Sequence, residues 1–328
     1  MEKNQEKMQY LGLFGIYKES YMVMLSWWKI FSTITLIFIL PLHLIVLFQI
    51  EVSQVILGDV LNYSKTLVLT PQQKNPIETI SLELLFVILI KLVNFDFIVL
   101  FPLLSISVVV YTVASIYTGR EVTFKKVTSV VPKVFKRLMI TLLCTFAAFF
   151  IYNIVVGIVF IVMWAITIRI REKYFGIATF AVTGILYIVG VLYLTIVWQL
   201  ANVVSVLEDS CGLIAMKKSN ELIKGKKGLS MMATFMFTVS FSLVQMLSMV
   251  FVNGWKLFQL AFVWRIASGV LCVLVLSHLI LLMLVIQTVL YYVCKSYHHE
   301  IIDMSTLPEH LEVDCANPYS HACLLQSV

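Results

Sequence analysis

Side chains able to do chemistry are scarce in this sequence, and four of them lie in or beside long apolar runs: His43, Lys91, Asp96 and His278. An ionisable group at membrane depth is by default a candidate functional site, because it is costly to bury in hydrocarbon. For the two histidines, the simpler interpretation is a neutral ring hydrogen-bonded between helices. Lys91 and Asp96 are five residues apart. For this pair, the simpler interpretation is an ion pair at the membrane interface. The functional alternative is a proton relay.

Motifs that would indicate catalysis are absent from the sequence. It contains no G-x-S-x-G, H-E-x-x-H, P-loop or GxGxxG pattern. The run His298-His299-Glu300 offers metal ligands, but adjacent histidines on a helix point to different faces, so we expect a solvated tail there. We therefore expect a non-enzymatic protein with no metal site and no cofactor.

The elements that carry these residues follow from composition. Of the 328 residues, 60% are hydrophobic and 13% are charged, against about 45–50% and 25% in ordinary globular proteins. A soluble fold could not hide so much apolar surface, and about 20 apolar residues in a helix cross a bilayer core. The sequence predicts an all-α, polytopic transmembrane helix bundle of about six spans. These cover residues 30–50, 97–118, 138–168, 174–207, 229–252 and 266–294.

The apolar stretch 82–95 is the ambiguous part of this assignment. A span containing Lys91 and Asp96 would carry two charges, each costing roughly 2.5–3.5 kcal/mol. We therefore interpret 82–95 as an interfacial or half-inserted helix, with Pro102 as a candidate kink in the span that follows. The domains expected are an N-terminal segment 1–29, a six-span membrane domain 30–294 and a C-terminal tail 295–328.

The orientation of the bundle follows from its basic residues. Most of the 24 Lys and Arg residues fall in the N-terminal segment, the second and fourth loops and the tail. By the positive-inside rule both termini face the cytosol, and the first span acts as an uncleaved anchor. Asn62, in the sequon Asn62-Tyr63-Ser64, then lies in a lumenal loop as a glycosylation candidate. These features suit the endoplasmic reticulum, another secretory-pathway membrane or the plasma membrane.

Three segments outside the spans look amphipathic, and we expect them to form interfacial helices: 10–28, 120–137 and 210–225. In the second segment, Pro132 suits the first turn of a new helix capped by Ser129, which then continues into the third span. In the third, Asp209 or Ser210 suits the N-cap and Gly225 the C′ position.

The last two segments concentrate positive charge, and we interpret them as one electrostatic surface. Its members are Lys125, Lys126, Lys133, Lys136, Arg137, Lys217, Lys218, Lys224, Lys226 and Lys227. The partners expected are membrane lipids with anionic headgroups or a cytosolic protein. The simpler alternative is that these residues only enforce topology in membrane-hugging connectors. No nucleic-acid module is present, so no direct nucleic-acid binding is expected.

Several short runs resemble an uncharacterised multi-pass membrane protein family of land plants. They are Leu11-Gly-Leu-Phe-Gly-Ile-Tyr-Lys-Glu-Ser, Pro41-Leu-His, Glu51-Val-Ser, the run Pro-Lys-Val-Phe-Lys-Arg-Leu at 132–138, and Tyr297-His-His-Glu. Some members of that family are labelled polyadenylate-binding protein-binding. More distantly, Glu208…Ala215…Ser219…Leu222…Gly225 is similar to a motif in the membrane domain of glycerophosphodiester phosphodiesterases. The resemblance implies a helical membrane module and brings no catalytic residue. The stretch 314–328 departs from the family tail.

Two functions are compatible with these features. The first is a non-enzymatic integral membrane protein that organises lipids or protein partners through its basic cytosolic loops. The alternative is a small-solute transporter or channel. Transporters often show internal repeats and broken helices, whereas the two halves of this chain do not repeat recognisably and contain only 13 Gly and 7 Pro. Polar groups within the spans would still permit a narrow path.

Overall fold

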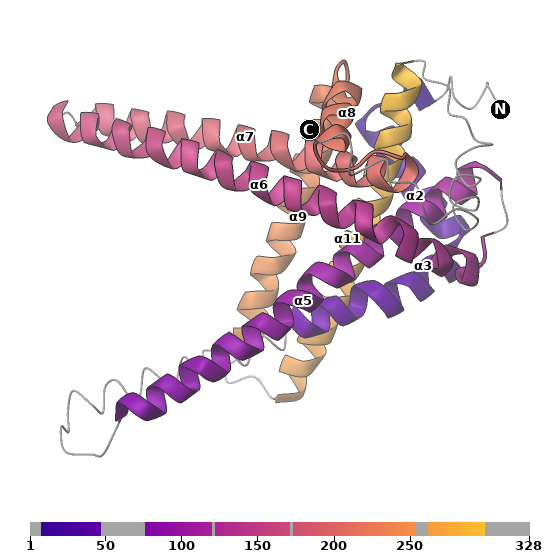
Figure 1. The fold of residues 1–328 in the computed structure, drawn as a ribbon, viewed down its shortest axis with the longest axis horizontal. Coiled ribbons are helices and arrows are strands. Elements are labelled where there is room, and N and C mark those ends of the chain that lie inside the picture. The colour runs from indigo at the N-terminus through magenta and orange to yellow at the C-terminus, as the bar shows by residue number, and fades with distance from the viewer. Residues whose placement is uncertain (1–7, 47–75, 120–121, 171–172, 254–261, 299–328) are drawn as a thin grey trace. The chain divides into compact units, whose positions relative to one another are not determined.

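The protein is all-α wherever the structure describes it. The computed structural model describes residues 8–46, 76–119, 122–170, 173–253 and 262–298 (Figure 1). The elements are α2 (Leu13–Ser26), α3 (Trp28–Ile34), the π-helical η1 (Thr35–Ile39), α5 (Pro76–Tyr117), α6 (Phe124–Ile170), α7 (Lys173–Leu207), α8 (Gly212–Ile223), α9 (Lys227–Asn253) and α11 (Phe262–Tyr297). The predicted fold class is confirmed.

Six helices in the described residues are long and apolar enough to cross a membrane, as the sequence predicted. They cover Trp28–Val46, Val99–Tyr117, Phe124–Arg169, Gly176–Leu207, Lys227–Ser248 and Ala267–Tyr297. The protein is therefore an integral, multi-pass membrane protein. The part of the predicted first loop that contains Asn62 lies outside the described residues.

Helix α5 joins two stretches that the sequence suggested were separate. The expected interfacial segment 82–95 and the span after Asp96 form one uninterrupted helix of 42 residues, with Pro102 inside it. At about 1.5 Å per residue this helix is roughly 63 Å long, so a large part of it extends beyond a ~30 Å hydrocarbon core. Its candidate span, Val99–Tyr117, lies after Asp96 as predicted.

Helix α6 corrects the prediction made for Pro132. No new helix begins there: α6 starts at Phe124 and continues through Pro132 to Ile170. Ser129 does not cap a helix, because its hydroxyl donates to the Lys126 carbonyl at 2.8 Å. A proline inside a helix costs about 3 kcal/mol. Burial of a valine face offsets that cost, since Val127, Val130, Val131 and Val134 are all buried.

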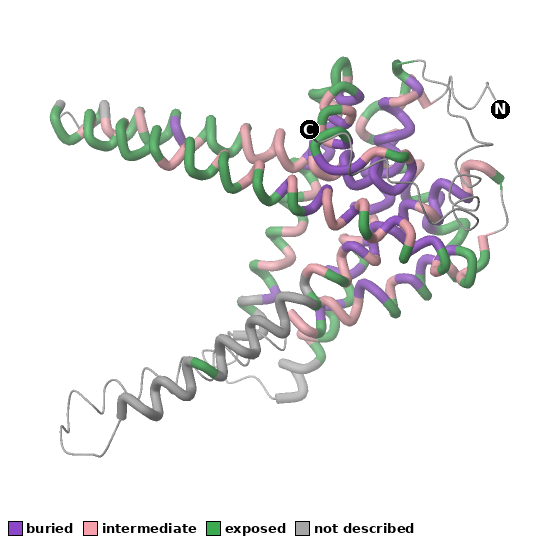
Figure 2. The backbone as a smooth tube through the Cα atoms, in the orientation of Figure 1, coloured by how far each residue is buried: buried purple, intermediate pink, exposed green. Residues whose placement is uncertain are grey.

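Helices α6 and α7 form a long antiparallel hairpin (Figure 1). The part of the hairpin far from α8 is mostly exposed (Figure 2) although it is apolar: Phe150 is 68% exposed and Trp164 63%. Apolar exposure on this scale is what lipid contact requires. Within the hairpin, Tyr152 donates from its hydroxyl to the Tyr187 carbonyl at 3.1 Å, and the two rings stack.

The chain divides into two compact units. Unit 1 comprises Met1–Trp28, Ile106–Leu243 and Leu282–Val328, and unit 2 comprises Lys29–Ser105 and Val244–Leu281. Buried aliphatic residues from several helices form the core of unit 1, including Val113, Leu138, Val204, Leu222 and Val289. This core holds the elements that carry most of the predicted site residues.

Candidate functional site

An acidic pair lies in the turn between α7 and α8. α7 ends at Leu207, Glu208 and Asp209 follow, and α8 begins at Gly212. Gly212 has a φ of 60°, a conformation that favours glycine. Its amide donates to Thr141 Oγ1 of α6 at 2.9 Å. The turn is thereby fixed against α6.

The ends of α8 bear out one prediction and correct another. Cys211 is the N-cap residue, without a side-chain hydrogen bond, so the prediction of Asp209 or Ser210 was wrong. The reason is that the Asp209 carboxylate pairs instead with Arg137 of α6, at 2.6 Å. At the other end, Gly225 follows the C-cap and has a φ of 93°, which confirms it as the C′ residue.

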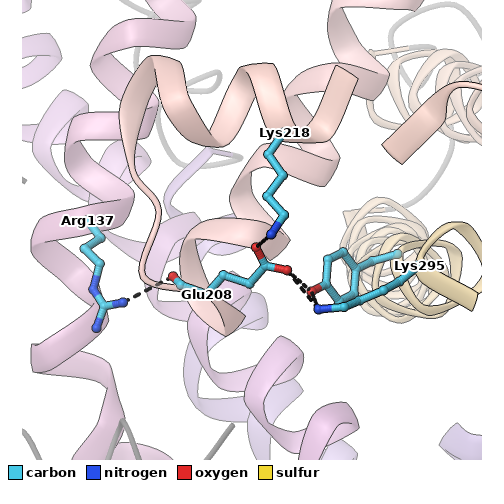
Figure 3. A network of polar contacts seen from close by, with 5 residues as sticks. Arg137, Glu208, Lys218 and Lys295 are labelled. Atoms are coloured by element: carbon cyan, nitrogen blue, oxygen red, sulfur yellow. Dashed lines mark hydrogen bonds and ion pairs between the residues drawn. The ribbon is translucent and has the colours of Figure 1, made fainter. Parts of the chain in front are cut away.

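The Glu208 carboxylate is the centre of a polar network (Figure 3). Its Oε2 lies 2.6 Å from Lys218 Nζ of α8, and its Oε1 lies 3.1 Å from Lys295 Nζ of α11. The hydroxyl of Tyr291, one turn before Lys295, donates to Oε1 at 2.6 Å. The main-chain oxygen of Glu208 accepts from Arg137 Nη1 at 3.2 Å. We call these five residues together with Asp209 the Glu208 network.

The network keeps Glu208 ionised although its side chain is only 12% exposed. Burial alone raises the pKa of this carboxyl, but hydrogen bonds from Lys218 and Tyr291 and the charge of Lys295 outweigh burial and leave the pKa below its ordinary value of 4.5. Within the described residues, the carboxylate accepts hydrogen bonds from side chains of α8 and α11. Such an arrangement holds helix ends together and offers no free base for catalysis.

Helix α8 is further attached to α7 by polar contacts. Ser219 Oγ donates to the Val197 carbonyl at 2.8 Å, and the Tyr193 hydroxyl donates to Asn220 Oδ1. The opposite side of α8 faces outward. Leu213 is 70% exposed there and Ile214 47%. The amphipathic helix predicted at 210–225 is thus confirmed, with an outer surface that is partly apolar.

The predicted basic surface divides into two groups. The first consists of side chains that are exposed, and we call them the exposed lysines: Lys125, Lys126, Lys136, Lys217, Lys224 and Lys227. The second is engaged within the protein. Arg137 and Lys218 belong to the Glu208 network, Lys133 is half-buried with a partner, and Lys226 donates to the Gln9 carbonyl at 3.1 Å. The structure therefore assigns the second group a packing role.

The four predicted intramembrane residues differ in their surroundings. In unit 2, His43 is buried, and its Nδ1 lies 3.0 Å from the Ile39 carbonyl and 3.2 Å from Ser277 Oγ of α11. This is the helix-to-helix hydrogen bonding that the simpler interpretation predicted. His278 is exposed. Lys91 and Asp96 lie in α5 at positions whose side chains are not described.

No three His, Cys, Asp or Glu side chains gather as metal ligands in the part of the chain that the structure describes. His298 was expected in a solvated tail. The residue is exposed, and its Nε2 also lies 3.1 Å from the Leu222 carbonyl, so the ring donates to the last turn of α8. His299 and Glu300 lie outside the described residues.

Four members of the Glu208 network were missed as site residues in the sequence: Glu208, Asp209, Tyr291 and Lys295. A signal for Glu208 and Lys295 was available. Each is the first charge after a long apolar run, and the positive-inside count places both on the same side of the membrane. Opposite charges at the same membrane level are candidates for pairing. Tyr291 carries no comparable signal, because its type is common in these spans.

Comparison with known proteins identifies a family but no activity. Residues 1–321 match the model of a family described as Domain of unknown function (DUF8558), and the chain belongs to that family. No curated protein and no solved structure matches the chain.

Proposed function

We propose that this member of the family is a non-enzymatic membrane protein that gathers anionic lipid headgroups against the exposed lysines on its cytosolic face. In this proposal both termini face the cytosol, and the protein resides in the endoplasmic reticulum or another membrane of the secretory pathway. Lysines near an anionic leaflet each contribute about 1 kcal/mol of attraction.

The observation that carries the proposal is the outer surface of α8. Leu213, at 70% exposure, lies one turn before the exposed Lys217. A helix that presents apolar and cationic side chains together is suited to the boundary between acyl chains and headgroups. The start of α6 adds Lys125 and Lys126, which are also exposed. The Glu208 network supports this arrangement because it ties the start of α6 to α8.

The internal ion pairs sharpen the proposal. Arg137 and Lys218 are engaged with Asp209 and Glu208, so their charges are already compensated and contribute little to an outer field. The exposed lysines carry the attraction instead. Neutralising Lys125 and Lys126 therefore changes lipid preference, whereas neutralising Arg137 or Lys218 changes stability.

The test uses the purified full chain in nanodiscs that contain phosphatidylcholine with increasing phosphatidylserine. Enrichment of phosphatidylserine around the protein is measured for wild type and for the double variant Lys125→Gln/Lys126→Gln. The matched control is Arg169→Gln/Lys173→Gln, which removes two charges at the far end of the α6–α7 hairpin. We expect the first variant to lose most of the enrichment and the control to keep it.

Two results would overturn the proposal. One is equal enrichment in all three proteins, which would leave the lysines with topology alone. The other is solute flux in proteoliposomes that depends on His278, which would favour the transport alternative. If lipid enrichment is unchanged in the double variant, the exposed lysines serve a cytosolic protein partner instead of lipids.

A further inference from the structure

A groove runs along one side of the N-terminal helix α2, entirely within unit 1. Its volume is about 560 Å³, and it is open on one side. The α2 residues that line it recur every three or four positions, from Gly15 through Met22 to Ser26, and Leu11 precedes them, so they form one stripe of the helix. The opposite wall is the end of α5, with Ile116 and Tyr117. The volume is that of an ordinary small-molecule site.

The groove is apolar except near its middle, where two opposite charges lie side by side. Lys18 and Glu19 both line it, and neither forms an ion pair within the residues that the structure describes. The Tyr117 hydroxyl, on the opposite wall, is buried and makes no hydrogen bond of normal geometry to a described residue. The Glu19 carboxylate lies close enough to act on that hydroxyl electrostatically. The groove therefore brings the Glu19 carboxylate and the Tyr117 ring together.

The position of the groove points to a lipid as the occupant. On the outer face of α2, Phe14 is 87% exposed and Tyr21 47%, and Trp28 at the start of α3 is 60% exposed. Aromatic rings of this kind settle at the membrane interface. A candidate span begins at Trp28, directly after the groove residue Trp27. The end of the groove at Trp27 is therefore at the level of the bilayer, where acyl chains can enter.

The charges specify the headgroup. We propose that the α2 groove binds one zwitterionic glycerophospholipid, with its ammonium group between Glu19, Tyr117 and Trp27 and its phosphodiester beside Lys18. A carboxylate and two aromatic rings suit an ammonium group, and a lysine suits a phosphate. A phosphate headgroup without an amine would leave Glu19 uncompensated beside another negative charge, so charge complementarity disfavours anionic lipids here.

This inference is separate from the proposed function. The exposed lysines attract anionic headgroups through α6, α8 and α9 without a cavity, whereas the α2 groove selects a headgroup of both charges in one site. Loss of one property need not affect the other, so an experiment can separate them.

The test is native mass spectrometry of the purified full chain with phosphatidylethanolamine, phosphatidylcholine or phosphatidylglycerol of identical acyl chains. We expect one retained zwitterionic lipid per protein and weaker retention of phosphatidylglycerol. Glu19→Gln should weaken retention about tenfold, the effect of losing one ion pair. The matched control Glu221→Gln, which changes an exposed glutamate of α8, should leave retention unchanged.

Two further variants keep the proposal falsifiable. Met22→Trp fills the groove without changing charge and should abolish retention even if Glu19→Gln folds poorly. Tyr117→Leu removes one of the two aromatic rings beside the ammonium group and should weaken retention of both zwitterionic lipids. Equal retention of phosphatidylglycerol, or equal behaviour of Glu19→Gln and Glu221→Gln, would overturn the inference. Lys125→Gln/Lys126→Gln should leave this retention intact.

Discussion

Replacing Glu208 by Gln tests the central claim that a buried carboxylate holds the helix ends together. The change keeps the shape of the side chain and removes its charge. Lys295, whose side chain is 12% exposed, and Lys218 would then lose their counter-ion. Removing one partner of a buried ion pair costs about 3–5 kcal/mol. For a chain of this size, that corresponds to a fall in apparent melting temperature of roughly 10 °C.

Asp209→Asn provides a matched control at the neighbouring position. The Asp209 side chain is 62% exposed, and its pair with Arg137 is therefore screened by solvent. Exposed pairs contribute about 0–1 kcal/mol, so the melting temperature of the control should fall by no more than about 3 °C. Both variants are measured in the same detergent at pH 7, with unfolding followed by loss of the monodisperse peak on size-exclusion chromatography. Equal falls for the two variants would refute the reasoning.

A comparison of wild type with Glu208→Gln also tests the pH dependence of stability. The pKa of Glu208 is lowered in the folded state from its ordinary value of 4.5. Its stabilising contribution is therefore fully present above about pH 4.5 and is lost as pH falls through the folded pKa. We expect wild type to lose stability over that acidic range and Glu208→Gln to lose less. Parallel curves for the two proteins would place the acid-sensitive group elsewhere.

Three further substitutions test single contacts by the same melting measurement. Tyr291→Phe removes one hydrogen bond to the charged carboxylate and should cost about 1.5–3 kcal/mol; no change would mean that the bond is not formed. Gly225→Ala should cost more than about 1 kcal/mol, because φ is 93° and the new Cβ would overlap the Tyr297 ring; an unaffected variant would contradict this turn geometry. Gly190→Ala should destabilise the α6–α7 hairpin, because its Cβ would overlap the Tyr152 hydroxyl. Adding Tyr152→Ala should relieve that overlap, and a double variant less stable than the single one would argue against this contact.

The spans could be predicted because the bilayer imposes a simple physical rule. A helix must be apolar for about 20 residues to cross it, and that pattern is local in sequence. The start of α6 was harder to predict, because Pro132 is a local signal for a helix start. Packing of Val127, Val130 and Val134 determines the outcome there, and which neighbours a valine face will meet is not visible in a single sequence.

The sequence predicts which basic residues share one side of the membrane, but not which of them are engaged in ion pairs. Charge counts predict the same cytosolic side for Arg137 and Lys218 as for Lys125 and Lys217. What separates these residues is whether a carboxylate lies within reach in three dimensions. Glu208 reaches Lys218 across a turn of known sequence, but its second partner, Lys295, is 87 residues away. Tertiary contacts of that separation require the folded structure.

Contacts within unit 1 also bear on the number of membrane crossings. The Tyr17 hydroxyl of α2 donates to the Ala233 carbonyl near the start of α9, at 3.1 Å. Near the end of α5, Tyr117 packs edge-to-face on Tyr292 of α11, with ring centroids 5.2 Å apart. Tyr117 also lines a groove together with α2, so helix α2, the end of α5 and the end of α11 lie at the same level. Only an even number of crossings can separate any two of them.

Two crossings lie between α2 and Tyr117. One is the candidate span Trp28–Val46, and the other belongs to α5, whose candidate span is Val99–Tyr117. Because α5 is a single uninterrupted helix, the stretch 82–95 cannot cross the bilayer separately and return. A seventh span at 82–95 would place Tyr117 on the opposite side from α2, which the groove that Tyr117 and α2 line together opposes. The charges of Lys91 and Asp96 thus belong to a helix that extends beyond its own crossing.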